Sequence, residues 1–460
     1  MGDTLRFAVI GDTHYVRRES HREFASDQGV PEGTGLARYV RMNREVLPTL
    51  MQSIKELGPS FIMHTGDLIH GTADDEGSKT EMREALALMD SFGAPVYYAV
   101  GNHDGLPGRP GGAAVTEVLL PALAKRLGRQ SMEQSYYQVQ MGASLLLVLD
   151  FTTYVPGGEQ EAFLEACLRQ KSSVVEHVFL FGHPPLVPVI RPFFTDFRYA
   201  SSVLQTLERY AVDAYFCGHT HNQIATLHRV GRRWLPQFKS STVAMPEELA
   251  VHVTDVRPLL PPADRFEYGW GYLEGSAPSW WMVYVDGPIV QVDWHVLGRG
   301  IFGTVTWSGA EKARFSSVSD LSPKTAGVLP AITDIRSMRL RVTGVQVSGE
   351  SAGAGMYEVY LNGNFIGCLP RLGAFTCREW IEVEPQYWRT IGSDNDLRIT
   401  TGEESMCMGG FLLEVETESG WVRSGVSSFF ANTPHWNHWK VEPLQIIQPG
   451  EDIQVRLMFA

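Results

Sequence analysis

Over roughly the first 300 residues, the chain alternates short apolar runs with stretches in which apolar residues recur at helical spacing. Each apolar run is nearly continuous, which is typical of a strand that is covered on both faces of its sheet. Amphipathic segments such as 47–57 and 80–92 predict helices outside the sheets, so we expect a layered α/β fold. The runs end at a glycine or a polar residue and occupy positions 5–12, 59–67, 94–104, 144–150, 176–185 and 212–221.

Beyond about residue 300, helical spacing fades and short strand-like runs follow one another. Asn362-Gly363, between two of these runs, is a typical sequence for a tight β-hairpin. Short strands at regular spacing predict a β-sandwich, and the hairpin resembles those of galactose-binding-like jelly-roll domains. We therefore predict an α/β domain over residues 1–303 and an all-β, jelly-roll-like accessory domain over residues 304–460.

The accessory domain has two interpretations. It is a module that binds a carbohydrate or a protein partner, or it packs on the first domain, shapes its cleft or joins two copies of the chain into a homo-oligomer.

Length, charge and cysteine content narrow the class of protein. A chain of 460 residues exceeds one typical domain, and its net charge of −13 argues against a broad nucleic-acid-binding surface. Five cysteines without a C-x-x-C pair predict reduced thiols and a cytoplasmic protein, with a disulfide between Cys368 and Cys377 as the alternative. We find no signal peptide before the first strand, and no run reaches the ~20 apolar residues of a membrane span.

Polar residues with metal-binding side chains recur where the predicted strands end. Such ends lie at one edge of an α/β sheet, where binding sites form, and donors two residues apart point to the same side of a strand. Oxygen and imidazole donors without thiolates favour Mn, Fe, Zn, Co or Ni over a soft metal. The candidate metal ligands are Asp12, His14, Asp67, Asn102, His183, His219 and His221, with His103 and Asp104 beside them.

These residues form an ordered set of motifs: D-T-H at 12–14, G-D at 66–67, G-N-H-D at 101–104, a histidine at 183 and G-H-T-H at 218–221. The set resembles the signature of the calcineurin-like metallophosphoesterase superfamily over roughly residues 5–300. The resemblance implies a four-layer α/β/β/α catalytic domain that holds two metal ions. One ion would be held by Asp12, His14 and His221, the other by Asn102, His183 and His219, and Asp67 would bridge both.

The same resemblance implies a reaction, the hydrolysis of a phosphoric ester by a hydroxide that bridges the two ions. His103 would assist the leaving group, and Asp104 would help to keep His103 protonated. Aspartate rather than glutamate at position 104 resembles the branch that acts on cyclic nucleotides and glycerophosphodiesters, so we expect a phosphodiesterase. The alternatives are a phosphomonoesterase for a sugar phosphate or nucleotide, a nuclease, and a non-catalytic scaffold.

Basic residues close to the first and third motifs are candidates for binding a small anionic substrate. Arginine side chains can hold a phosphate through two parallel hydrogen bonds. The alternative interpretation is a solvated loop face. The candidates are Arg17, Arg18, His21, Arg22 and Arg109.

Overall fold

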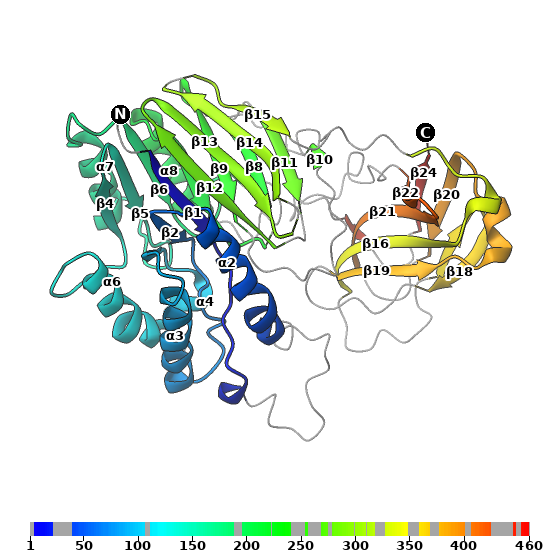
Figure 1. Ribbon diagram of the computed structural model, residues 1–460, viewed down its shortest axis with the longest axis horizontal. Helices are drawn as coiled ribbons and strands as arrows, with labels where there is room; N and C mark the ends of the chain where they lie inside the picture. Colours follow the sequence, from blue (N-terminus) through cyan, green and yellow to red (C-terminus); the bar gives the residue numbers. More distant parts are fainter. Residues whose placement is uncertain are drawn as a thin grey trace. The chain divides into compact units, whose positions relative to one another are not determined.

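A computed structural model gives the fold of the chain (Figure 1). It describes residues 4–21, 39–105, 111–187, 196–221, 223–240, 254–255, 268–274, 278–298, 300–309, 311–317, 327–347, 358–368, 377–400, 406–424, 445–447 and 452–459. The chain divides into two compact units, one of Met1–Arg257 with Pro262–Ser319 and the other of Pro258–Pro261 with Asp320–Ala460.

The first unit contains a seven-stranded mixed sheet. β1 runs parallel to β2, and β2 runs parallel to β3, whereas β12 pairs with the other edge of β1 in the antiparallel sense. In spatial order the strands are β15 (Arg314–Ser317), β14 (Gly300–Ser308), β13 (Ile289–Val296), β12 (Ser279–Asp286), β1 (Leu5–Ile10), β2 (Phe61–His64) and β3 (Val96–Tyr98).

A second, eight-stranded sheet completes the strand layers of this unit. Its centre is parallel, because β5, β6, β7 and β9 run in one direction, and antiparallel strands flank them. In spatial order the strands are β10 (Thr254–Asp255), β11 (Tyr268–Glu274), β8 (Gln223–Val230), β9 (Arg233–Lys239), β7 (Ala214–Cys217), β6 (His177–Phe181), β5 (Ser144–Val148) and β4 (Tyr137–Met141).

The helices of this unit follow from local sequence signals. α3 begins after Asp74, whose side chain accepts a hydrogen bond from the Gly77 amide, and α8 begins after Asp196, which caps it in the same manner. The helices are α2 (Leu47–Glu56), α3 (Asp75–Asp90), α4 (Asn102–Gly105), α5 (Gly111–Ala114), α6 (Leu120–Arg126), α7 (Glu159–Arg169) and α8 (Phe197–Arg209). No helix within the described segments is long and apolar enough to cross a membrane.

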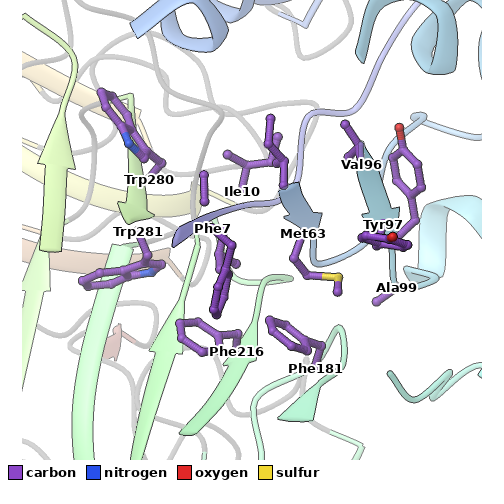
Figure 2. Packing of buried hydrophobic residues seen from close by; sticks show 14 of the residues in the cluster. Phe7, Ile10, Met63, Val96, Tyr97, Ala99, Phe181, Phe216, Trp280 and Trp281 are labelled. Carbon is purple, nitrogen blue, oxygen red and sulfur yellow. The ribbon is translucent and has the colours of Figure 1, made fainter. Parts of the chain in front are cut away.

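Aromatic side chains pack the two sheets of the first unit against each other. Phe7 of β1 stacks on Phe61 with ring centroids 4.8 Å apart and meets Phe179 of the other sheet edge-on at 5.4 Å. Figure 2 shows Phe7 and Met63 beside Phe216 and Phe181 from the second sheet. The apolar runs are therefore central strands of a two-sheet core.

The helices cover the outer faces of the two sheets. Alternate residues of β5 point to opposite sides, so that Leu146 belongs to the core between the sheets and Leu147 packs with residues of α7 and α8. Residues of α2 and α3 pack on the first sheet. The first unit is therefore an α/β/β/α sandwich, as predicted.

The second unit consists of two antiparallel sheets around a separate apolar core. Asn362 and Gly363 both have positive φ, as a two-residue hairpin turn between β17 and β18 requires. One sheet contains β19 (Cys377–Glu382), β16 (Ser337–Val347), β21 (Met406–Thr417), β22 (Gly420–Arg423) and β23 (Gln445–Ile447), and the other contains β18 (Asn364–Cys368), β17 (Glu358–Leu361), β20 (Asp394–Ile399) and β24 (Ile453–Met458).

Two details differ from the sequence-based expectations. The first unit continues to Ser319, beyond the boundary predicted at position 303, because β14 runs through that position and pairs with β13 and β15 of the first sheet. Cys368 has a free thiol, so the alternative of a disulfide with Cys377 is not found.

Candidate metal centre

The candidate site begins where β1 and β2 end side by side. The two loops that follow remain paired, because the His14 amide donates to the Asp67 carbonyl oxygen at 2.9 Å and the Tyr15 amide donates to the Leu68 carbonyl oxygen at 2.7 Å. A parallel bridge between Tyr15 and Ile69 extends this pairing. Backbone hydrogen bonds thereby hold together the two loops that carry the polar side chains.

A first group of potential ligands consists of Asp12, His14, Asp67 and His221. His14 Nε2 lies 2.9 Å from His221 Nε2 and 3.6 Å from Asp67 Oδ2. His221 Nε2 lies 3.7 Å from Asp12 Oδ1. Separations of this size are those of atoms that bind one ion at about 2.0–2.2 Å. The donor set therefore fits a metal ion such as Zn or Mn.

A second group adjoins the first and consists of Asp67, His183 and His219. His183 Nε2 lies 3.1 Å from Asp67 Oδ2, 3.1 Å from Asn102 Oδ1 and 3.1 Å from His219 Nδ1. Asp67 thus belongs to both groups, and Asn102 lies beside the second. The structure brings together all seven residues that the sequence predicted as ligands.

The backbone at this site adopts a conformation that L-residues normally avoid. Among the non-glycine residues that the structure describes, six have φ in the left-handed region, and the sixth is the hairpin residue Asn362. The other five are the candidate ligands Asp12 (φ 53°), His14 (43°), Asp67 (55°), His219 (76°) and His221 (53°). Left-handed backbone at such residues costs roughly 1–3 kcal/mol each and clusters at functional sites.

Burial and charge perturb the ionisation of these side chains. Burial raises the pKa of Asp12 to about 8 and lowers that of His14 well below its ordinary value. Burial also acts against the charge of His183, but the Asp67 carboxylate beside it raises the pKa of His183 to about 9. The pKa of Asp67 is lowered, because the charges of His183 and His103 overcome the effect of burial. The site is thus a buried set of carboxylates and imidazoles, which suits a cation.

His103 and Asp104 lie in the short helix α4, and their hydrogen bonds go to two neighbouring loops. His103 Nδ1 lies 2.7 Å from the His70 carbonyl oxygen. The Asp104 carboxylate accepts hydrogen bonds from the Ile69 and Gly101 amides, both at 3.0 Å. Asp104 therefore joins the loop after β2 to the loop after β3, and this positions His103.

Two of the candidate substrate-binding residues contact glutamate side chains of the protein. His21 is buried with Nε2 2.7 Å from Glu81 Oε1, and Arg17 lies 3.5 Å from both Glu19 and Glu84. Arg18 is exposed. Arg22 and Arg109 lie outside the described residues.

Two further residues contact the candidate ligands but were not among the predicted site residues. Phe151, in the loop that follows β5, stacks on His183 with ring centroids 5.7 Å apart, and its ring centroid lies 6.1 Å from that of His219. His70 lies with Nδ1 3.2 Å from His14 Nδ1. Phe151 follows Asp150 at a predicted strand end, and this position was the one sequence signal that could have identified it.

The comparisons with known proteins agree with this geometry. Residues 5–223 match the model of the calcineurin-like phosphoesterase family. Metal-dependent hydrolysis of phosphoesters is the chemistry of the family. No curated protein sequence matches the chain.

Several solved structures match parts of this chain at low sequence identity. A purple acid phosphatase from yellow lupin (Lupinus luteus) is 13% identical, with a TM-score of 0.47 over 69% of this chain and 54% of that one. The present chain thus spans about half of the length of the lupin protein. A dimetal phosphatase from Danio rerio is 13% identical, with a TM-score of 0.42 over 68% of this chain and 99% of that one. GAP50 of Plasmodium, an anchor in the inner membrane complex, is 12% identical, with a TM-score of 0.43 over 67% of this chain and 90% of that one.

Proposed function

We propose that the protein hydrolyses phosphoric esters with the aid of two metal ions. The observation that carries the proposal is that Asp67 belongs to two adjoining groups of potential ligands. A carboxylate has lone pairs for two cations, so it can hold both ions within one site. Asp12, His14 and His221 would hold the first ion with Asp67, and Asn102, His183 and His219 would hold the second.

The ions, when bound, would lower the pKa of water to near neutrality and stabilise the negative charge of the reacting phosphoryl group. The chain itself supplies a candidate proton donor. Because His103 Nδ1 faces a carbonyl oxygen, that nitrogen carries a hydrogen, and Nε2 is left to face the substrate. A protonated His103 would donate from Nε2 to the leaving oxygen. Asp104 would contribute by positioning this histidine rather than by contacting the substrate.

We further propose a phosphodiester as the substrate class. The support is the G-N-H-D motif with aspartate at position 104, as in the branch that acts on cyclic nucleotides and glycerophosphodiesters. A monoester of a sugar or nucleoside is the alternative, and the two classes differ in the charge and bulk that the site must admit.

The test compares bis-p-nitrophenyl phosphate, a diester, with p-nitrophenyl phosphate, a monoester, on protein stripped of metal and reloaded with Mn, Zn, Ni or Fe. We expect metal-dependent turnover with preference for the diester. Preference for the monoester would contradict the diester assignment. Metal binding without turnover on either compound, or on natural phosphoesters, would contradict the hydrolase proposal and favour a scaffold.

The variant His103→Ala tests the role of the proton donor. It should retain both metal ions, as measured by elemental analysis, and lose about 10²–10⁴-fold in turnover. The loss should be smaller for a leaving group of low pKa, such as p-nitrophenolate, than for an alkyl ester, because a good leaving group needs less proton assistance. Equal losses for both substrates would contradict the role.

A further inference from the structure

His70 occupies a fixed position between two functional loops. Its amide donates to the Tyr15 carbonyl oxygen at 3.1 Å, which continues the backbone pairing of the loops after β1 and β2. The next residue, Gly71, lies against the start of α4, because a Cβ atom there would come within 1.9 Å of the His103 carbonyl oxygen. The backbone of His70 is therefore held on both sides.

The side chain of His70 meets the ring nitrogen of His14 that faces away from the first ligand group. His14 Nε2 lies 2.9 Å from His221 Nε2, whereas His14 Nδ1 lies 3.2 Å from His70 Nδ1. A nitrogen that binds a metal must present its lone pair, so a His14 that binds through Nε2 carries its hydrogen on Nδ1. That hydrogen can be donated to His70 Nδ1, and His70 then carries its own hydrogen on Nε2.

The main chain of His70 contacts a second functional candidate, His103. The His70 carbonyl oxygen accepts from His103 Nδ1 at 2.7 Å, and the two imidazole rings stack with centroids 4.8 Å apart and planes 23° apart. His70 therefore contacts a candidate ligand through its ring and the candidate proton donor through its carbonyl group.

We infer that His70 is a positioning residue that fixes the ring orientation and hydrogen placement of His14 for metal binding, while its carbonyl oxygen does the same for His103. This inference rests on the proposed two-metal site. Its chemical basis is that a ligating histidine is held by an acceptor on its other nitrogen. Here the acceptor would be Nδ1 of the His70 ring.

Two variants separate the acceptor from the ring. His70→Phe keeps a ring against His103 but removes the nitrogen that accepts from His14, whereas His70→Asn removes the ring and places an amide oxygen near the position of Nδ1. Both keep the backbone carbonyl group. Co²⁺ is the probe, because its visible spectrum reports the ligand geometry directly and needs no turnover. Thermal unfolding of the metal-free proteins checks that both variants fold.

We expect His70→Phe to weaken binding of one Co²⁺ ion by about 10–100-fold and to change the Co²⁺ spectrum, with His70→Asn close to wild type in both. Wild-type affinity and spectrum in His70→Phe would overturn the inference. If both variants bind one Co²⁺ ion where the wild type binds two, His70 is itself a ligand and the positioning role is wrong. Should His70→Phe not fold, His70→Leu removes the same nitrogen in a smaller side chain.

The measurement also separates this inference from the proposed function. Absence of turnover in the Co²⁺-loaded wild type would contradict the proposed hydrolysis and leave the binding result standing. Unchanged binding in His70→Phe, with turnover present in the wild type, would contradict only the positioning role.

Discussion

At the scale of single residues, each motif glycine makes room for a ligand of another motif. A Cβ atom on Gly218 would lie 2.4 Å from Asp12 Oδ2, and one on Gly101 would lie 2.1 Å from Asp67 Oδ1. Neither glycine has a φ in the left-handed region, so the close approach, not backbone freedom, requires glycine. The spacing between ligands of different loops thus depends on the absence of a side chain.

Gly218→Ala should therefore impair metal binding more than folding. The added methyl group must displace Asp12, whose carboxylate accepts from the His219 amide at 2.8 Å, so two candidate ligands move together. We expect a loss of at least about tenfold in metal affinity, measured by titration with Mn²⁺. Gly392→Ala is the control, because its added Cβ would have no neighbour closer than 3.8 Å. Equal affinities in the two variants would contradict the steric argument.

At the scale of elements, the loop after β5 supports the second ligand group from outside. The Asp150 carboxylate accepts from Ser135, Thr152 and Thr153, and the side chain of Gln160 in α7 bonds both the amide and the carbonyl group of Asp150. This network holds the next residue, Phe151, against the rings of two candidate ligands. An apolar ring there restricts the movement of the imidazoles and keeps water from their faces.

Phe151→Ala should consequently weaken the second metal site while the first remains near wild type. We expect the affinity for one of two Mn²⁺ ions to fall by about tenfold or more, because the imidazoles of His183 and His219 lose a packing partner. Calorimetric titration resolves the two binding events. Phe151→Leu, which preserves most of the apolar volume, is the matched control. Its Mn²⁺ affinity should lie between those of the wild type and Phe151→Ala. A uniform loss at both sites would argue for a general loosening of the unit instead.

The same elements show what a sequence can predict and what it cannot. The six apolar runs are β1, β2, β3, β5, β6 and β7, because strands buried on both faces must be continuously apolar. The candidate ligands could be predicted because their side-chain chemistry stands out at the ends of those runs. Phe151 has no metal-binding side chain and could not be recognised in this way. It lies beside the candidate ligands because β5 pairs with β6 in the sheet. The predicted boundary at 303 lies inside β14, which pairs with β13 and β15 of the first sheet, because consecutive strands at the end of the first unit have the same sequence texture as the strands of the second unit.

At the scale of the whole molecule, a buried histidine forms a hydrogen bond between the two sheets of the first unit. His177 begins β6 of the second sheet, and its Nε2 donates to the carbonyl oxygen of Gly287, in the turn between β12 and β13 of the first sheet, at 2.7 Å. Its Nδ1 lies 3.1 Å from Asp213 Oδ1. Both partners are acceptors, so both ring nitrogens bond best when the imidazole is protonated.

This contact should make the stability of the first unit depend on pH. Burial acts against the charge of His177, but the hydrogen bonds to Asp213 and Gly287 raise its pKa above the ordinary value. A raised pKa in the folded state contributes stability that is complete below the unfolded pKa of about 6.5 and is lost as pH rises through the folded value. His177→Gln keeps the donor toward Gly287 but has no charge, so it should lose about 1.5–3 kcal/mol at pH 5.5 and less at pH 9. Urea unfolding of metal-free protein at both pH values measures the difference.

Asp213→Asn removes the carboxylate partner of His177 and should flatten the pH dependence of stability in the same way. The double variant should add little to either single change, because the two residues form one interaction. Parallel pH–stability curves for the wild type and His177→Gln would show that the imidazolium does not join the sheets.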